Sequence, residues 1–360
     1  MSIPVDSSPK ISVLMSVYNG EQFLREAIDS ILQQTYRDFE FIIVNDGSQD
    51  RSEEIIRSYE DPRIRFYSNG QNLGLIPSLN RGLQMAQGEF LARLDADDVA
   101  LPQRLEKQVQ VLESSPEIVL TGTQMQLIDS DGKDLEVWAY PEHPLLARWV
   151  MMFNTPVSNS SVLARAQPMR EVGGYRIEYK YAEDFDLWSR LAEHGDVVNL
   201  PEVLGKYRVH GESVTTTREQ EQNELRFRIT RPHLEKHLSH HPDEVLRRLG
   251  DSSLRLTCPQ MKQALQAYQD LFTSFVTEHQ PNAQIQAQIR SDLIARIGPQ
   301  FQALGYGSRL RSMLSQRELF GGRFWWTGRF LWYSMSDRNK RALKSLLGLR
   351  HRGIDRSEQN

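Results

Sequence analysis

The chain has 360 residues, 25% of them charged, and a formal net charge of −4. Its length is enough to bury a sizeable core in one large or two ordinary domains, and its acidic balance argues against a nucleic-acid binder. The single cysteine, Cys258, excludes an internal disulfide framework and suits a reducing compartment. The amino terminus lacks the pattern of a signal peptide and no apolar run reaches about 18 residues, so we expect a cytoplasmic protein.

Strand and helix patterns alternate along roughly the first 130 residues. Short apolar runs predict strands, and the stretches between them place apolar residues on one helical stripe. Alternating strands and helices predict a parallel sheet with helices on both faces. The predicted strands are 11–17, 39–44, 63–67 and 89–94, and the predicted helices are 21–34, 52–59, 76–86 and 102–113.

The middle of the chain has a more mixed pattern, and the last third is charged and Gln-rich. Helical spacing dominates the last third, so we expect a mainly α-helical region there. In the middle, the predicted strands are 118–128, 161–164 and 197–209, and the predicted helices are 144–153 and 182–193.

Three carboxylates stand directly behind the strand predicted over 89–94, at Asp95, Asp97 and Asp98. Acidic residues crowded at a strand end repel one another unless they share a cation. With oxygen ligands only and no nearby His or Cys, the fitting cation is Mg²⁺ or Mn²⁺, which binds carboxylates together with substrate phosphates. The cluster therefore indicates phosphate chemistry.

Two other interpretations of this acidic cluster compete with a Mg²⁺ or Mn²⁺ site. The first is a solvated turn, because Asp is common in turns and at helix N-termini and Pro102 opens a predicted helix. The second is a calcium loop of the helix-loop-helix type. That loop needs an oxygen ligand and a glycine at its fifth and sixth positions, where Val99 and Ala100 stand.

Polar clusters follow three of the predicted strands, at residues 18–20, 45–48 and 95–98. Ligands of parallel α/β sheets bind beyond the carboxyl ends of the strands. One crevice is therefore expected to collect all three clusters.

Seven motifs occur in order between residues 10 and 215: ISVLMSVYNG, QQTY, VNDGSQD, NLGL with Asn80 and Gly82 after it, GEFLARLDADD, EDFDLW and YRVHGES. Together they resemble the glycosyltransferases of family 2. The resemblance implies an α/β fold of the GT-A type, a Rossmann-like, mostly parallel sheet flanked by helices. It also implies transfer of a sugar from a nucleotide diphosphate donor to a hydroxyl, with inversion of the anomeric centre.

This resemblance suggests a division of the chain into three regions. Residues 1–125 would form the nucleotide-sugar-binding half of the GT-A domain, and residues 126–214 the half that binds the acceptor and carries the catalytic base. Residues 215–360, a helical region with an aromatic and basic tail, fall outside the resemblance.

The resemblance implies a nucleotide site at the ends of the first strands. Tyr18 would stack on the base and Asp46 would accept a hydrogen bond from a base N–H; a turn tyrosine and a helix-capping Asp are the alternative. Asn45 stands where many relatives have another Asp, which weakens the preference for uridine, although a UDP-sugar is the favoured donor. The implied donor-binding residues are Ser16, Tyr18, Asn19, Glu21, Asp46, Asn72 and Asp95.

For the leaving group, the resemblance implies that Asp95 lies near the ribose or diphosphate. Asp97, favoured over Asp98, would bind Mn²⁺ or Mg²⁺, which stabilises the charge of the departing diphosphate. His210 matches a terminal motif in which a histidine approaches the metal or the diphosphate. A hydrogen-bonded surface histidine is the alternative for His210.

Two adjacent acids, Glu183 and Asp184, begin a predicted helix. The resemblance implies that Asp184 is the base that removes the proton of the acceptor hydroxyl, with Glu183 orienting it or binding the acceptor. The alternative is that both acids interact only with the positive end of the helix dipole, an effect of about 0.3–1 kcal/mol. Trp188, on the same helix, is expected in the core.

Two other functions share part of this pattern. A glycoside hydrolase also uses paired carboxylates but needs no nucleotide crevice, and a catalytically inactive nucleotide-sugar-binding protein would not need every acidic position. The expected acceptor is a glycan or lipid-linked sugar, because surface polysaccharide and lipid-linked glycan synthesis are the commonest settings of such enzymes. Its loops are expected near 138–140 and 154–161, where Asn159-Ser160-Ser161 replaces a His-Pro pair often seen there.

Aromatic and basic residues alternate in the tail between residues 323 and 341. This composition suits a helix lying in a membrane interface, with rings at the headgroup level and cations toward anionic lipid. The alternative is a helix that docks its aromatic rings on the catalytic domain. Peripheral membrane contact of this tail is therefore a hypothesis.

Overall fold

Strands that are buried on both faces form the centre of the protein's sheet. In a computed structural model, which describes residues 8–210, 219–250 and 257–302, every residue of β2 (Phe39–Asn45) is buried. In β1 (Ile11–Val17) successive side chains alternate between two hydrophobic clusters, so that Leu14 packs on one face while Val13 and Met15 pack on the other. Burial on both faces explains why these strands are mostly apolar.

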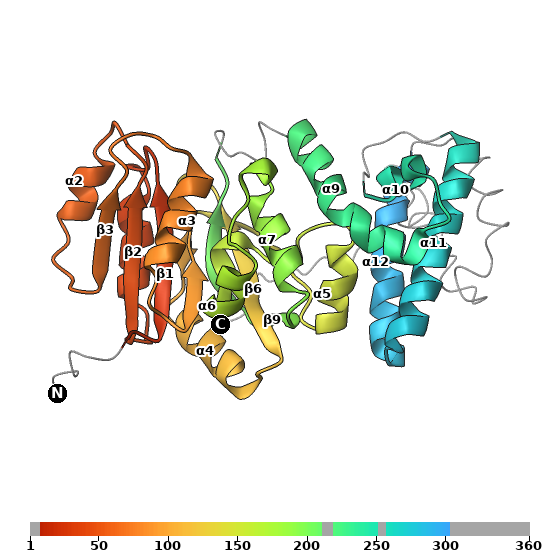
Figure 1. Ribbon diagram of the computed structural model, residues 1–360, viewed down its shortest axis with the longest axis horizontal. Helices are drawn as coiled ribbons and strands as arrows, with labels where there is room; N and C mark the ends of the chain where they lie inside the picture. The colour runs from red at the N-terminus through yellow and green to blue at the C-terminus, as the bar shows by residue number, and fades with distance from the viewer. Residues whose placement is uncertain (1–7, 211–218, 251–256, 303–360) are drawn as a thin grey trace, which may run out of the picture. The chain divides into compact units, whose positions relative to one another are not determined.

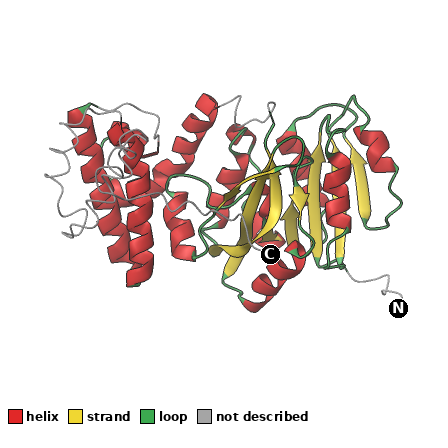
Figure 2. Ribbon diagram, turned by 180° about the vertical axis from the view of Figure 1, so that it is seen from behind, coloured by secondary structure: helices red, strands yellow, loops and turns green. Residues whose placement is uncertain are grey.

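The sheet has nine strands (Figures 1 and 2). Besides β1 and β2 they are β3 (Ile64–Ser68), β4 (Phe90–Arg93), β5 (Val99–Ala100), β6 (Ile118–Ile128), β7 (Asp134–Trp138), β8 (Leu163–Arg165) and β9 (Asp196–Arg208). Their order is β3-β2-β1-β4-β8-β6-β9-β5, with β7 paired to β6. The first four strands are parallel, and β8 runs antiparallel to both β4 and β6, so the complete sheet is mixed.

Helices cover both faces of this sheet, as the sequence predicts (Figure 2). One face packs against α1 (Leu24–Leu32), α2 (Ser52–Arg57) and α4 (Arg104–Ser114). The other packs against α3 (Leu75–Met85), α5 (Pro144–Met151), α6 (Ala166–Glu171) and α7 (Glu183–Leu191). The predicted α/β fold with flanking helices is therefore confirmed, and Trp188 of α7 is fully buried in the core as expected.

The chain divides into two compact units, Met1–His233 and Leu234–Asn360. The boundary falls within α9 (Glu219–Leu238), and the described part of the second unit continues with α10 (Asp243–Gly250), α11 (Cys258–His279) and α12 (Ala283–Gln302). The predicted helical character of the last third is confirmed for these residues. Among the described helices none is long and apolar enough to cross a membrane, and the aromatic and basic tail lies outside the described residues.

Helix α3 approaches β1 so closely that position 82 has no room for a side chain. A Cβ on Gly82 would stand 2.0 Å from Cδ1 of Leu14, inside the fully buried core. We predict that Gly82→Ala lowers the free energy of unfolding by about 1–3 kcal/mol, because Leu14 must leave its packed position. Urea unfolding would measure this. Gln84→Ala, an exposed position on the same helix, is the matched control, and equal stability of the two variants would contradict this packing.

Candidate active site

The loops after β1 and β2 are joined by reciprocal hydrogen bonds. The backbone N–H of Asn19 donates to Ser48 Oγ at 3.0 Å, and Asn19 Oδ1 accepts from the backbone N–H of Gln49 at 2.9 Å. Asn19 has a φ of 50°, a left-handed conformation that Asn tolerates. Glu21 accepts from the backbone N–H of Arg51 at 3.0 Å. The side chains of Asn19 and Glu21 therefore hold the two loops together, while Tyr18 is 49% exposed beside them.

Asp46 organises a third loop, residues 69–74, beyond the end of β2. Its Oδ1 accepts hydrogen bonds from Asn69 Nδ2 at 2.8 Å and from the backbone N–H of Leu73 at 2.9 Å. Its Oδ2 accepts from the backbone N–H of Gly74 at 2.8 Å. The loop passes so close that a Cβ on Gly47 would stand 2.3 Å from its backbone, and Gly47 has a φ of +71°. Asn72, in the same loop, is exposed; Ser16 lies half-buried near the end of β1.

Asp95 follows β4 and contacts residues from both sides of the strand end. Arg93, itself fully buried, donates from a guanidinium NH₂ to Asp95 Oδ1. On the other side, Ser160 Oγ and Asn159 Nδ2 donate to Asp95 Oδ2 at 3.0 Å and 3.3 Å. The 3₁₀ turn that carries these two residues, Asn159–Ser161, therefore reaches the acidic cluster through Asp95.

Asp97 and Asp98 have different surroundings although they are adjacent. The Asp97 side chain is 37% exposed, and its Oδ2 lies 2.9 Å from His210 Nε2. Asp98 is only 1% exposed, and its Oδ1 accepts from the backbone N–H of Arg208 in β9 at 2.8 Å. Burial and the charge of Asp95 raise the pKa of Asp97. Burial and the charges of Asp97 and Asp95 raise the pKa of Asp98 well above its ordinary value.

Buried arginines tie the backbone together beneath these carboxylates. Arg208 donates from Nε to the carbonyl of Asp97 at 2.9 Å and from NH₂ to Glu26 at 2.6 Å. Arg104 is fully buried and donates to the carbonyls of Ser160 at 2.7 Å and of Arg93 at 2.8 Å. Burial lowers the pKa of Arg104 to about 9. Buried guanidinium groups therefore lie next to the acidic cluster, and their hydrogen bonds to backbone carbonyls fix the position of its backbone.

The two acids at the start of α7 belong to the same electrostatic environment. Glu183 Oε2 accepts from the backbone N–H of Tyr181 at 2.7 Å, and burial together with the Asp184 charge raises the pKa of Glu183 to about 7. Asp184 also has a raised pKa, because of its burial and the nearby charge of Asp95, while Arg226 opposes this shift. The buried Tyr175 hydroxyl has no hydrogen-bond partner among the described residues, and burial, together with the charges of Asp184 and Glu183, raises its pKa.

The structure therefore connects Asp95, Asp97, Asp98, Glu183 and Asp184 electrostatically. It does not bring Asp97, Asp98 and His210 into one compact three-ligand group within the described chain. Asn159 and Ser160, expected in an acceptor loop, contact Asp95. Several other residues of the site were not predicted as such from sequence. They are Arg93, Arg104, Tyr175 and Arg208.

Comparison with known proteins gives the family. A family model described as Glycosyl transferase family 2 matches residues 12–162. An uncharacterized glycosyltransferase of Haemophilus influenzae is 38% identical over 251 residues, which cover 65% of this chain and 76% of that protein. The chain belongs to glycosyltransferase family 2. The predicted family is thus confirmed, and the protein is a transferase of sugars.

The name of a second relative includes the process in which that relative acts. The amylovoran biosynthesis glycosyltransferase AmsE of Erwinia amylovora is 34% identical over 212 residues, which cover 58% of this chain and 79% of AmsE. This family member and the Haemophilus protein support the same assignment.

Solved structures agree with the GT-A fold. Residues 1–349 of TarS from S. aureus, crystallised with UDP-GlcNAc, match with a TM-score of 0.54 and 17% identity, covering 86% of this chain and 90% of that one. The mannosyltransferase PcManGT from Pyrobaculum calidifontis, in complex with GDP-Man and Mn²⁺, matches with a TM-score of 0.50 and 15% identity, covering 96% and 89%. At such identities the likeness shows the fold.

The raised pKa of Glu183 predicts a pH dependence of stability. Between its ordinary pKa of 4.5 and about 7 in the folded protein, the folded state binds more protons than the unfolded state at this carboxyl. The free energy of unfolding should therefore fall as the pH rises through this window. Glu183→Gln removes the titrating group, so its stability should depend less on pH.

Urea unfolding of the wild type and of Glu183→Gln at about pH 5 and about pH 8 measures this difference. Glu193→Gln, an exposed acid beyond the end of the same helix, is the control and should keep the wild-type dependence. An identical pH dependence in wild type and Glu183→Gln would contradict a raised pKa of Glu183 in the folded protein.

Proposed function

We propose that this protein transfers a sugar from a nucleotide diphosphate donor, with UDP favoured, to a hydroxyl acceptor with inversion, using a divalent metal ion. The observation that carries the proposal is the pair Glu183 and Asp184. The pKa values of both carboxyls are raised, so each binds a proton more readily than an ordinary carboxyl, and the charge of Asp95 acts on both. Paired, partly buried carboxylates with raised pKa values are a feature of general-base sites.

The donor's nucleotide would lie against the loops that follow β1 and β2. The exposed ring of Tyr18 offers a face for stacking on the base, beside loops that Asn19 and Glu21 hold in place. Asp46 Oδ2 accepts one hydrogen bond, from Gly74, and a carboxylate oxygen has a second acceptor site for a base N–H. Ser16, Asn72 and Asp95 would complete the donor site.

UDP is favoured because TarS, which shares the fold, was crystallised with UDP-GlcNAc. The GDP-Man complex of PcManGT shows that the same fold accepts another nucleotide. Asn45 replaces the second Asp of many relatives, so the sequence alone supports UDP only weakly.

The residues near Asp97 fit a divalent cation. Asp98 Oδ2 is buried and has no hydrogen-bond partner among the described residues, which is unfavourable for an ionised carboxylate unless a positive charge lies nearby. Asp97 and His210 would hold the ion, because their facing atoms are 2.9 Å apart and both side chains are partly exposed. Asp98, whose Oδ1 accepts a hydrogen bond from the backbone of Arg208 in β9, would help to hold these two ligands in place. Bound there, Mn²⁺ or Mg²⁺ would neutralise the charge of the departing diphosphate.

Asp184 would accept the proton of the acceptor hydroxyl. As this oxygen forms its bond to the anomeric carbon, the bond from that carbon to the diphosphate breaks, and the diphosphate leaves with the electron pair. Attack from the face opposite to the leaving group inverts the anomeric centre. Glu183 would orient Asp184 or contact the acceptor.

The acceptor would be a glycan or lipid-linked sugar in surface polysaccharide or lipid-linked glycan synthesis. The relative AmsE carries a name from polysaccharide synthesis, amylovoran biosynthesis. The segments 138–140 and 154–161 are the proposed acceptor loops. We further propose that the reaction takes place in the cytoplasm, in keeping with a single cysteine, and that the carboxy-terminal tail contacts the membrane surface.

If Asp97 is the metal ligand, Asp97→Ala should abolish metal-dependent sugar transfer. The protein should stay folded, because a side chain that is 37% exposed contributes little to the core. Transfer from a UDP-sugar with added Mn²⁺, together with circular dichroism, tests both points. Asp131→Ala, an exposed Asp in the turn before β7, should keep full activity. Full activity of Asp97→Ala, or of the wild type in EDTA, would refute the metal assignment.

Asp184→Asn keeps the shape of the side chain and removes its basicity. We expect the transfer rate to fall by roughly two to four orders of magnitude, with nucleotide affinity near that of the wild type. Single-turnover kinetics and calorimetric titration with UDP measure the two quantities separately. Glu193→Gln again serves as the control. A loss of donor binding as large as the loss of rate would make Asp184 a donor-binding residue instead of the base.

A further inference from the structure

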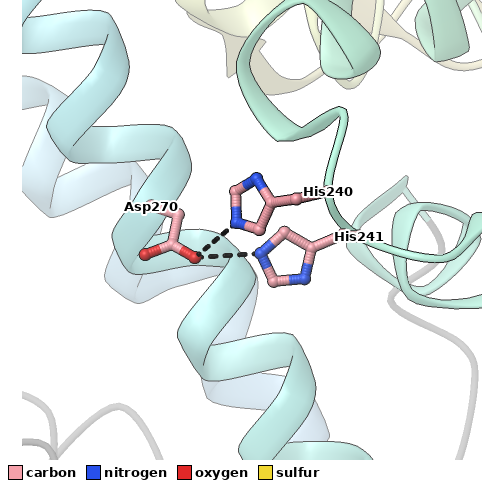
Figure 3. Close-up of side chains that lie close together, drawn as sticks. All are labelled: His240, His241 and Asp270. Atoms are coloured by element: carbon pink, nitrogen blue, oxygen red, sulfur yellow. Dashed lines mark hydrogen bonds and ion pairs between the residues drawn. The ribbon is translucent and has the colours of Figure 1, made fainter.

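Two adjacent histidines in the second unit point at the same carboxylate oxygen (Figure 3). His240 and His241 lie in the turn between α9 and α10, and Asp270 lies on α11. Their Nε2 atoms are 3.3 Å and 2.9 Å from Asp270 Oδ2. Neighbouring residues usually direct their side chains apart, but these two rings converge, with centroids 4.3 Å from each other.

These distances match the spacing of ligands around a transition-metal ion. Four ligands at about 2.0–2.1 Å in a tetrahedron are about 3.3 Å from one another. One ligand atom from each of the three residues lies within 4.8 Å of the others, and within the described chain no other group of His, Cys, Asp or Glu meets this criterion with three members. Two imidazole nitrogens and one carboxylate oxygen form a ligand set typical of Zn²⁺ and unlike the oxygen sites of Mg²⁺.

The surroundings hold the three ligands in position. Asp270 Oδ1 accepts from Gln266 Nε2 at 2.9 Å, so the carboxylate is oriented by a second residue on its own helix. The backbone N–H of His241 donates to the carbonyl of Leu238 at 2.9 Å, which fixes the turn to the end of α9.

The site is also accessible. The His240 side chain is 63% exposed, whereas that of His241 is 12% exposed. An ion could therefore enter from the solvent side and keep a water molecule as its fourth ligand, as zinc does where the protein supplies three. Two hydrogen bonds to one carboxylate are the alternative explanation of the same geometry.

We propose that His240, His241 and Asp270 bind Zn²⁺ or a similar transition-metal ion. The ion links the α9–α10 turn to α11 and stabilises the helical unit. The site is separate from Asp97 and His210, which lie in the other unit, and its ligand set selects a different class of metal. The inference does not depend on the proposed sugar transfer.

The test is zinc binding by the untagged full-length protein. Competition with a chromogenic chelator gives the affinity, and Co²⁺ substitution reports a nitrogen-containing, four-coordinate site through its visible absorption. We expect tight binding of Zn²⁺ and a Co²⁺ spectrum of tetrahedral type. His240→Ala should weaken Zn²⁺ binding by about tenfold or more and remove that spectrum. Because its side chain is mostly exposed, this variant should fold normally.

Two further variants make the outcome decisive. Asp270→Asn keeps an acceptor for both histidines but lacks the charge, so it should also lose Zn²⁺ binding. His194→Ala, an exposed histidine of the first unit, should bind as the wild type does. Zn²⁺ should raise the thermal midpoint of the wild type more than that of His240→Ala, with sugar transfer equal in both. Equal Zn²⁺ affinity and equal Co²⁺ spectra in wild type and His240→Ala would overturn the site.

Discussion

Repulsion among carboxylates at one edge of the sheet is the constraint on which the rest of the site depends. Asp95, Asp97 and Asp98 follow β4 within four residues, and burial together with their mutual charge raises the pKa of Asp97 and Asp98. An uncompensated buried charge is unfavourable by several kcal/mol. Buried guanidinium groups compensate part of this negative charge. Arg93 forms an ion pair with Asp95, and Arg208 donates a hydrogen bond to the backbone carbonyl of Asp97.

The architecture around this edge follows from the same constraint. Because β8 lies between β4 and β6, the turn that precedes it is carried to Asp95, where Asn159 and Ser160 donate hydrogen bonds. Strand β9 supplies a backbone donor to Asp98, and the nearby His210 faces Asp97. Each neighbouring segment thus contributes a donor or a cation to the acidic cluster. The compensation is incomplete, since Asp98 Oδ2 is still unpaired within the described structure, and this favours an additional positive charge.

Sequence patterns predicted seven of the nine strands and missed β5 and β7. The bounds predicted for β1 and β6 agree with the structure; β1 is mostly apolar, and β6 has apolar residues at both of its ends. Strand β7 is exposed throughout and β5 has only two residues, so neither shows a hydrophobic periodicity that can be recognised in the sequence. The acidic positions could be found from motifs. The buried arginines could not, since an Arg in a strand looks like a solvated residue until the tertiary partners are known. The proposed division at residue 125 falls within β6 and stays a prediction.

We propose that a divalent cation shared with the donor's diphosphate completes the acidic edge. The most direct measurement is the thermal unfolding midpoint of the protein with UDP, in Mn²⁺ and in EDTA, because a ligand that binds the folded state raises its stability. We expect UDP and Mn²⁺ together to raise the midpoint more than the sum of their separate effects, since each binds more tightly beside the other. An equal rise with UDP in Mn²⁺ and in EDTA would contradict it.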